Sequence, residues 1–219
     1  MRADADYATP KDQLYYAGVN DHVLALVPED ARRVLDVGCA AGNLGAAIKQ
    51  TRPGAVVHGV ETEPNAARMA RERLDRVFEA DLNQAVPMLD GPYDCITCGD
   101  VLEHLIDPWS ALAGLVGQLA AGGRVVASIP NVRHYKVLRD LVLRGRFRYR
   151  EAGIMDSTHL RFFTLTEMKR LFDGAGLRVV AQRPRLIGGN AVIRLLDGAL
   201  LGRLEELRAV QYTLVGVHA

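Results

Sequence analysis

The segment Val34-Leu-Asp-Val-Gly-Cys-Ala-Ala-Gly-Asn-Leu-Gly45 decides the fold. Its apolar start belongs to a predicted buried strand over residues 33–37, and a helix is expected to begin near Asn43. The small residues between them let the backbone approach a bound ligand closely. The first turn of the helix offers N–H groups and the positive end of a dipole, which suit a negatively charged or carbonyl-bearing ligand. The segment therefore predicts a strand, a ligand-binding turn and a helix.

Two kinds of ligand compete for such a turn. The dinucleotide fingerprint is G-x-G-x-x-G, in which the second glycine admits the pyrophosphate. Gly38, Ala40 and Gly42 do not satisfy that spacing. A carboxylate at Asp36 would repel a pyrophosphate but could hold the ammonium group of an amino acid. The turn therefore favours S-adenosylmethionine, whose tail is a zwitterion and whose sulfonium is a cation.

Short apolar runs alternate with helical periodicities along the chain, which is typical of a parallel sheet with helices on both faces. We predict the α/β fold class, with a doubly wound, seven-stranded sheet in a single domain over residues 1–219. Strands are expected at residues 33–37, 55–60, 76–79, 93–98, 124–129, 177–182 and 212–217. Helices are expected at residues 44–50, 64–74, 107–121, 164–175 and 190–208. Ligands of such sheets bind beyond the carboxyl ends of the strands.

Acidic residues follow the second and third predicted strands. Glu61 ends the second strand, where a carboxylate can accept both ribose hydroxyls, although a dinucleotide enzyme would place an acid there too. Asp81 follows the third strand and can accept a hydrogen bond from an adenine amino group, with Leu82 against the ring. Acidic residues that follow three successive strands indicate one binding site for a nucleoside-bearing cofactor. The alternative, that each acid is an unrelated solvated loop residue, is disfavoured by their regular placement.

The segment 34–42 resembles motif I of the class I S-adenosylmethionine-dependent methyltransferases, and Glu61, Asp81 and the stretch 93–108 resemble their later motifs. Ala40 stands where the usual G-C-G-x-G pattern has its middle glycine, which is a mild departure. The segments 129–135 and 153–164 are similar to a bacterial subgroup that accompanies glycan and natural-product biosynthesis. The resemblance implies a Rossmann-like methyltransferase fold with a mostly parallel sheet and an antiparallel last strand.

The predicted cofactor site follows from the turn, the acids and the resemblance. The resemblance also implies that residues 1–30 form a helical lid, in which Tyr15 or Tyr16 could close over the methionine end of the cofactor. The candidate cofactor-binding residues are Tyr15, Tyr16, Asp36, Gly38, Cys39, Ala40, Gly42, Asn43, Glu61, Asp81, Leu82, Gly99, Asp100 and Val101.

Methyl transfer to a hydroxyl requires removal of a proton, and histidine is the natural base near neutral pH. His104 follows the fourth strand, at the ligand-binding edge of the sheet, and His159 lies in a polar run before an apolar segment. Both are candidate catalytic bases, and each has a structural alternative. Asp100-x-x-Glu103 has the spacing of a capping box, with His104 in the first turn of a helix. His58 and His218, which lie in strands, are expected to be structural, and His22 is expected on the surface of an N-terminal helix.

Residues 131–163 are expected to form a substrate-facing insertion, with Asn131, Arg133, His134 and Tyr135 as candidate substrate-binding residues. Asp100, Glu103 and His104 could instead gather a divalent metal, as in some catechol-type methyltransferases. Octahedral oxygen sites need several carboxylates from separate elements, and the sequence presents no second cluster. We therefore expect no metal.

A basic stretch between Arg133 and Arg150 has seven Lys/Arg and one acid, Asp140. Its arginines alternate with aromatic residues, a pattern that fits nucleic acid, a phosphorylated or nucleotide-linked small substrate, or a solvated edge strand. We expect a small-molecule acceptor, possibly anionic or sugar-linked, whose hydroxyl is methylated. N-methylation, RNA methylation and a nucleotide-binding protein without transfer activity are the alternatives.

Composition adds limits to these expectations. The net charge is +1, so the whole molecule has no field that would attract nucleic acid. No apolar window is long enough to span a membrane, and the first residues carry charges where a signal peptide is apolar. Cys39, Cys95 and Cys98 are expected to be reduced thiols, which indicates a cytoplasmic protein, and the Cys95/Cys98 pair is interpreted as two packed side chains.

Overall fold

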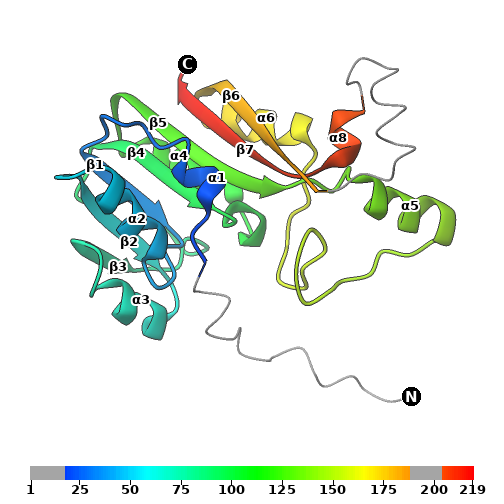
Figure 1. Ribbon diagram of the computed structural model, residues 1–219, viewed down its shortest axis with the longest axis horizontal. Helices are drawn as coiled ribbons and strands as arrows, with labels where there is room; N and C mark the ends of the chain where they lie inside the picture. Colours follow the sequence, from blue (N-terminus) through cyan, green and yellow to red (C-terminus); the bar gives the residue numbers. More distant parts are fainter. Residues whose placement is uncertain (1–17, 188–203) are drawn as a thin grey trace.

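The computed structural model describes residues 18–187 and 204–219, and its centre is one seven-stranded sheet (Figure 1). The strand order is β3-β2-β1-β4-β5-β7-β6. The strands are β1 (Arg33–Val37), β2 (Val56–Glu61), β3 (Arg76–Glu79), β4 (Tyr93–Gly99), β5 (Leu119–Pro130), β6 (Leu177–Leu186) and β7 (Ala209–His218). The first five strands pair in parallel, whereas β7 pairs antiparallel with both β5 and β6. The predicted mostly parallel sheet with an antiparallel last strand is confirmed.

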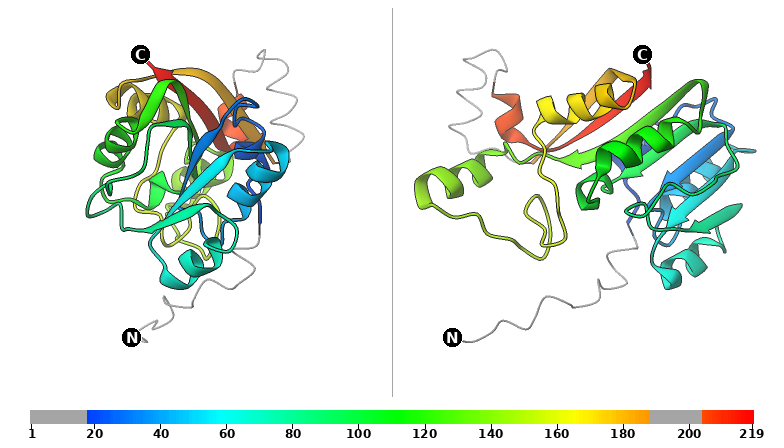
Figure 2. Two further views of the ribbon diagram at one scale, coloured as in Figure 1. Left: turned by 90° about the vertical axis from the view of Figure 1, so that its left-hand side faces the viewer. Right: turned by 180° about the vertical axis from the view of Figure 1, so that it is seen from behind.

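Helices cover both faces of the sheet (Figure 2). They are α1 (Asp21–Leu24), α2 (Asn43–Thr51), α3 (Pro64–Ala70), the 3₁₀ helix η1 (Leu102–His104), α4 (Pro108–Val116), α5 (Tyr135–Arg144), α6 (Leu165–Gly174) and α8 (Glu205–Arg208). Buried side chains of α4 and α6 pack on one face, and those of α1, α2 and α3 pack on the other. No helix in the described ranges has the length and hydrophobicity that a membrane span needs.

Two helix starts form as their sequences predict. The Asp107 side chain accepts a hydrogen bond from the Ser110 N–H at 3.1 Å, so it caps α4 ahead of Pro108. The Thr164 hydroxyl accepts from the Glu167 N–H at 3.4 Å and caps α6. Local side-chain chemistry is sufficient to set these two boundaries.

The end of α4 differs from the expectation. The helix ends at Val116, and the segment 121–123, expected to close it, lies inside β5 instead. A Cβ on Gly123 would stand 2.9 Å from the carbonyl oxygen of Tyr93, where the pairing of β4 with β5 shifts register. Gly123 therefore permits close pairing of β5 with β4, whereas a Cβ on Gly122 would meet no atom within 4 Å. A helix boundary could not be inferred from these two glycines.

Other boundaries move by smaller amounts. The helix expected over 64–74 ends at Ala70, while β6 and β7 extend beyond the expected 177–182 and 212–217 because they pair with each other along their lengths. Of the helix expected over 190–208, the structure describes only Glu205–Arg208, as α8. Its preceding part and the segment 1–17 of the expected lid lie outside the described residues.

Cys95 and Cys98 are free, buried and on opposite faces of the sheet. Cys95 packs in the cluster with α2, and Cys98 packs in the cluster with α4. Burial raises the pKa of both thiols, which keeps them protonated. The interpretation of this pair as two packed side chains is confirmed.

The segment 131–163 extends past the carboxyl end of β5 as α5 and a long loop (Figure 1). None of the residues buried in the two core clusters comes from α5. The arginine-rich part, 145–150, is irregular, so its interpretation as a solvated edge strand is wrong. The charged segment folds toward the ligand-binding edge of the sheet.

Candidate functional site

A cavity of about 1460 Å³ opens at the carboxyl ends of β1, β2 and β4. This volume exceeds the range of about 300–1,000 Å³ that is usual for a single ligand pocket, so it has room for two ligands. Eleven of the candidate cofactor residues line it: Asp36, Gly38, Cys39, Ala40, Asn43, Glu61, Asp81, Leu82, Gly99, Asp100 and Val101. Gly42 does not line the cavity and is the N-cap of α2. Tyr15 and Tyr16 lie outside the described residues.

The turn after β1 depends on its small residues. Gly38 has φ +64°, and a Cβ there would stand 2.5 Å from the Cγ2 atom of Val101. Gly42 has φ +81°, and its Cβ would approach the Cα of Ala70 to 3.1 Å. Ala40 has φ +48°, in the left-handed region that residues with a side chain rarely adopt. The backbone of this turn therefore passes close to the cavity in a conformation that suits glycine.

Glu61 holds this turn in place. One carboxylate oxygen accepts from the Ala40 N–H at 2.8 Å, and the other accepts from the Thr62 and Glu63 N–H groups at 2.9 Å. The side chain is 8% exposed and still lines the cavity. Glu61 thus has a structural role that its position after β2 did not predict, because the bond to Ala40 joins two loops that are 21 residues apart.

Asp36 is a buried carboxylate within β1, and it reaches the cavity from the strand rather than from the turn. Its Oδ1 atom accepts from the Thr97 hydroxyl at 2.8 Å, whereas Oδ2 is buried without a hydrogen-bond partner. Burial raises the pKa of Asp36 to about 7, and the nearby Glu61 adds to that shift. A cation placed in the cavity beside Oδ2 would offset this cost.

Asp100 joins three elements at the end of β4. Its side chain accepts from the Asn20 amide at 3.0 Å and from the Gln211 amide, and its N–H donates to Ser128 at 3.1 Å. The residue has φ +57°, and burial raises its pKa to about 6. The expected capping box with Glu103 does not form, because Val101 is the N-cap of η1 and Asp100 turns toward α1 and β7.

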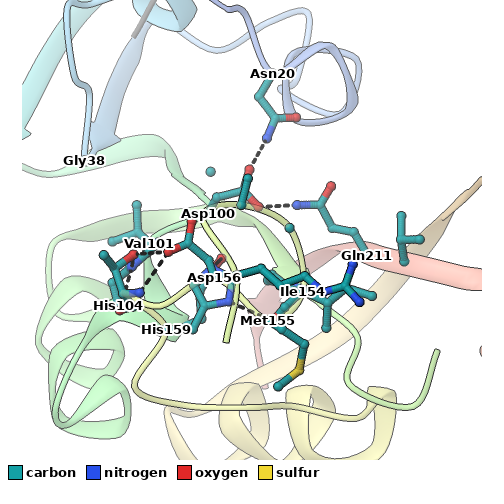
Figure 3. Close-up of a pocket in the computed structure, with 18 of the residues that line it drawn as sticks. Asn20, Gly38, Asp100, Val101, His104, Ile154, Met155, Asp156, His159 and Gln211 are labelled. Atoms are coloured by element: carbon teal, nitrogen blue, oxygen red, sulfur yellow. Dashed lines mark hydrogen bonds and ion pairs between the residues drawn. The ribbon is translucent and has the colours of Figure 1, made fainter. Parts of the chain in front are cut away.

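His104 and His159 come together although they are far apart in the sequence (Figure 3). Their ring centroids are 4.8 Å apart in an edge-to-face arrangement, and Nε2 of His159 is 3.9 Å from Oε1 of Glu103. Both histidines line the cavity, as does Glu103, which is 1% exposed. The sequence did not associate Glu103 with His159, because the contact spans two elements.

The two imidazoles are oriented by backbone carbonyls. Nδ1 of His159 is 3.0 Å from the Ile154 carbonyl oxygen, and Nδ1 of His104 is 3.1 Å from the Thr158 carbonyl oxygen. The Thr158 hydroxyl oxygen is also 3.1 Å from Nδ1 of His104, but its hydrogen is donated to Asp156 at 2.7 Å. A carbonyl oxygen only accepts, so each Nδ1 carries the hydrogen. In the neutral ring Nε2 then carries the lone pair, which can accept a proton or bind a metal.

The four candidate substrate-binding residues divide into two groups. His134 lines the cavity, and burial lowers its pKa to about 4. The Asn131 amide is fully buried and donates to the carbonyls of Glu206 and Ala209. Arg133 forms an ion pair with Glu206. Neither Asn131, Arg133 nor Tyr135 is among the lining residues.

The basic stretch supplies the outer wall of the cavity. Asp140 pairs with Arg139, Arg144 and Arg150, while Arg146 and Arg148 form no ion pair with any residue in the described ranges. The basic lining residues are Lys136, Arg139, Arg144, Arg146, Arg148, Arg150 and Arg185. This end of the cavity therefore carries an excess of positive charge.

Some lining residues were not anticipated from the sequence. Asn20, Arg185 and Gln211 reach the cavity from α1, β6 and β7. Asn20 precedes a short helix and Gln211 lies within a strand, so no local motif marks either residue. Only their contacts with Asp100, at separations of 80 and 111 residues, reveal their place.

Comparison with known proteins identifies the family. A family model described as a methyltransferase domain matches residues 13–182. The ubiquinone biosynthesis O-methyltransferase of Aeromonas salmonicida is 29% identical over 154 residues, which cover 68% of this chain and 63% of that protein. The trans-aconitate 2-methyltransferase of Methylobacterium radiotolerans is 36% identical over 110 residues, covering 50% of this chain and 42% of that protein. The chain thus spans less than two thirds of the length of these curated relatives.

Solved structures share the fold at low identity. A methyltransferase from Thermotoga maritima, described as a possible histamine N-methyltransferase, superposes with a TM-score of 0.63 at 18% identity, over 94% of this chain and 89% of that one. The calicheamicin biosynthesis methyltransferase CalO1, solved with S-adenosylhomocysteine bound, gives a TM-score of 0.56 at 20% identity, over 94% of this chain and 54% of that one. With the family match over residues 13–182, the chain belongs to the class I S-adenosylmethionine-dependent methyltransferases.

Proposed function

We propose that this protein transfers the methyl group of S-adenosylmethionine to a hydroxyl oxygen of a small anionic acceptor, such as a sugar or natural product. The observation that carries the proposal is the meeting of Glu103, His104 and His159 in the same cavity as the buried carboxylate of Asp36. In this proposal, residues at one end of the cavity bind S-adenosylmethionine, and those at the other end remove the proton of the acceptor hydroxyl. The names of the curated relatives, an O-methyltransferase and a trans-aconitate methyltransferase, agree with a small acceptor.

The residues around β1 and β2 fit the cofactor. The buried Oδ2 atom of Asp36 matches the ammonium group of the methionine tail, since that cation offsets the desolvation of the carboxylate. Gly38 lines the cavity, and the absence of a Cβ lets its backbone pack against Val101 in the turn that would hold the tail. We assign Glu61 to the ribose hydroxyls, and Asp81 and Leu82 to the adenine, since all three line the cavity. When bound, the cofactor supplies a methyl carbon on a positively charged sulfur.

The histidine pair supports removal of the acceptor proton. Since Nδ1 of each ring donates to a carbonyl, Nε2 is the atom that takes the proton from the hydroxyl. Glu103 stabilises the positive charge that forms on His159, at a present separation of 3.9 Å. The deprotonated oxygen forms a bond to the methyl carbon, and the electron pair of the carbon–sulfur bond returns to sulfur.

The basic wall supports an anionic acceptor. Arg146 and Arg148 have guanidinium groups that no described acid neutralises, and guanidinium binds phosphate and carboxylate oxygens in a bidentate manner. Apolar lining residues, among them Phe147, Ile154 and Met155, suit an attached ring or chain. An acceptor with one anionic group and one apolar part fits both features.

Two measurements test the proposal. Calorimetry should detect binding of S-adenosylhomocysteine but not of NAD, and NAD binding without S-adenosylhomocysteine binding would reject the proposal. Mass spectrometry of anionic metabolites incubated with the protein and S-adenosylmethionine should then detect a product heavier by one methylene unit. Methylation confined to amines or to RNA would reject the hydroxyl assignment while leaving the cofactor site intact.

A further inference from the structure

Glu103, His104 and His159 form a cluster that the chemistry of proton removal does not fully explain. One ligand atom from each side chain lies within 4.8 Å of the others, and all three residues line the cavity. Figure 3 shows the two histidines side by side. Glu103 and His159 are 1% and 7% exposed, and His104 is half-buried. Removal of one proton needs one imidazole with a carboxylate beside it, which leaves the second imidazole unexplained.

The backbone builds this cluster firmly. The Glu103 carbonyl accepts from the N–H groups of Leu160 and Arg161 at 2.9 and 3.0 Å, which joins η1 to the end of the loop that carries His159. Asp156 accepts from the N–H and hydroxyl of Thr158 at 2.8 and 2.7 Å, which fixes the turn before His159. The three ligand atoms therefore converge because two separate elements are held together by backbone hydrogen bonds.

The outer contacts of both imidazoles match those of metal ligands. A histidine that binds a metal usually donates its other ring N–H to a carbonyl or carboxylate, which fixes the tautomer and the ring orientation. His159 and His104 make this contact through Nδ1, with the carbonyls of Ile154 and Thr158. Each Nε2 then has the lone pair that a cation requires.

We propose that Glu103, His104 and His159 bind a divalent transition-metal ion, with Zn²⁺ or Mn²⁺ favoured over Mg²⁺. Two imidazoles and one carboxylate form the His₂Glu ligand set of catalytic zinc sites, in which a fourth position stays open for water or substrate. Magnesium prefers an octahedron of oxygen ligands, which two imidazoles do not provide. Neighbouring ligands of a tetrahedral zinc ion lie about 3.3–3.6 Å apart for bonds of about 2.0–2.2 Å, and the separation of Nε2 of His159 from Oε1 of Glu103 is 3.9 Å. The three ligand atoms, now within 4.8 Å of one another, would have to approach by up to about 1 Å for tetrahedral coordination.

The catalytic consequence rests on the function proposed above. A cation in this position lowers the pKa of an acceptor hydroxyl at its open side, and the released proton passes to water. In the metal-loaded protein the two imidazoles act as ligands rather than as bases. The acceptor oxygen forms its bond to the methyl carbon as before, and the carbon–sulfur electron pair remains on sulfur.

Metal binding can be tested without a known acceptor. Full-length protein is freed of metal by dialysis against a chelator and titrated by calorimetry with Zn²⁺, Mn²⁺ or Mg²⁺ in separate runs. We expect one equivalent of Zn²⁺ or Mn²⁺ to bind at least about tenfold more tightly than Mg²⁺. His104→Ala and Glu103→Gln should each weaken this binding by at least about tenfold, the lower bound for losing even an outer contact of a metal site. His22→Ala is the matched control, because His22 is exposed on α1 and does not line the cavity.

The outcomes separate this inference from the proposed function. The metal site is overturned if the wild type binds Zn²⁺ and Mn²⁺ no more strongly than a protein lacking the cluster. It is also overturned if His104→Ala binds these ions as tightly as the wild type. Each sample is also titrated with S-adenosylhomocysteine, which reports whether the variants are folded. Binding of S-adenosylhomocysteine without metal binding rejects the metal alone, and the reverse result rejects the cofactor assignment alone.

Discussion

The two sides of the cavity are built by different forces. On the cofactor side, around β1 and β2, the Glu61 carboxylate accepts three backbone N–H groups and Asp36 is 2% exposed. On the acceptor side, α5 contributes no buried residue, and Arg139 and Arg144 form exposed ion pairs with its one acid, Asp140. Buried hydrogen bonds fix geometry, while exposed ion pairs contribute little stability each. Under the proposed function, the fold therefore holds the donor site in place, and substitutions in the acceptor wall should have little effect on stability.

The largest expected effect lies where the two sides meet. His104→Ala and His159→Ala should each lower kcat by about 10²–10⁴-fold, the usual contribution of a positioned acid–base group. Affinity for S-adenosylhomocysteine should change by less than about twofold, because the contacts proposed for the cofactor come from Asp36, Gly38 and Glu61 and not from either ring. Turnover is measured with an acceptor found by mass spectrometry, and His22→Ala is the control. Full turnover in both variants would remove the histidines from the chemistry.

The next effect tests the cofactor side. Asp36→Asn should weaken S-adenosylhomocysteine binding by about 10–100-fold, because a hydrogen bond to a charged group contributes about 1.5–3 kcal/mol. Because burial raises the pKa of Asp36 to about 7, wild-type affinity should rise as pH increases through 7. The Asn variant should lack that rise. Calorimetry across this range measures both, and an identical pH profile in the two proteins would contradict the assignment.

The same substitution should stabilise the ligand-free protein. Because the pKa of Asp36 is raised in the folded protein, stability is lost as pH rises from the ordinary aspartate pKa of 3.8 to about 7. At pH 8 the Asn variant should therefore have the higher Tm, with a shift of about 2–4 °C for each kcal/mol gained. Below pH 4 the two melting curves should converge. A variant that melts at a lower temperature than the wild type at pH 8 would show that the buried carboxylate of Asp36 does not destabilise the folded protein.

A smaller effect is expected on the acceptor side. Arg146→Ala and Arg148→Ala should each raise KM for an anionic acceptor by about fivefold, consistent with about 1 kcal/mol for an exposed charge contact. The kcat and the affinity for S-adenosylhomocysteine should not change, and the KM effect should shrink at high salt. Arg170→Ala is the control, since Arg170 pairs with Glu167 on α6, away from the cavity. An equal KM increase in the control would exclude a specific contact.

The smallest effect concerns the turn itself. Ala40→Gly should change stability by no more than about 1 kcal/mol, because relief of the strain at φ +48° is offset by the greater freedom of glycine in the unfolded chain. Gly38→Ala provides the contrast, since its Cβ would meet Val101 at 2.5 Å. Thermal melting compares the two. Similar losses in both variants would show that the turn tolerates neither substitution.

Elements with local signals were predictable. The Asp107 and Thr164 caps, the strand over Arg33–Val37 and the turn at Gly38 follow from side chains within a few residues of each other. The end of α4 was mispredicted because Gly123 permits close pairing of β5 with β4, which no local pattern reveals. The role of Asn131 was mispredicted for the same reason. A polar residue after a strand suggested substrate binding, but its side-chain amide donates to backbone carbonyls of α8 and β7.

By itself, the sequence determined the doubly wound sheet, the turn after β1 and the acids at the ends of β2 and β3, because periodicity and loop chemistry are short-range properties. Only the tertiary structure decided that Glu103, His104 and His159 converge, that Asp36 is buried with an unpaired oxygen, and that the arginines of 144–150 face the cavity. These features depend on backbone hydrogen bonds and burial between segments more than 50 residues apart, such as Glu103 with Leu160. The spacing of residues along the chain does not predict such contacts.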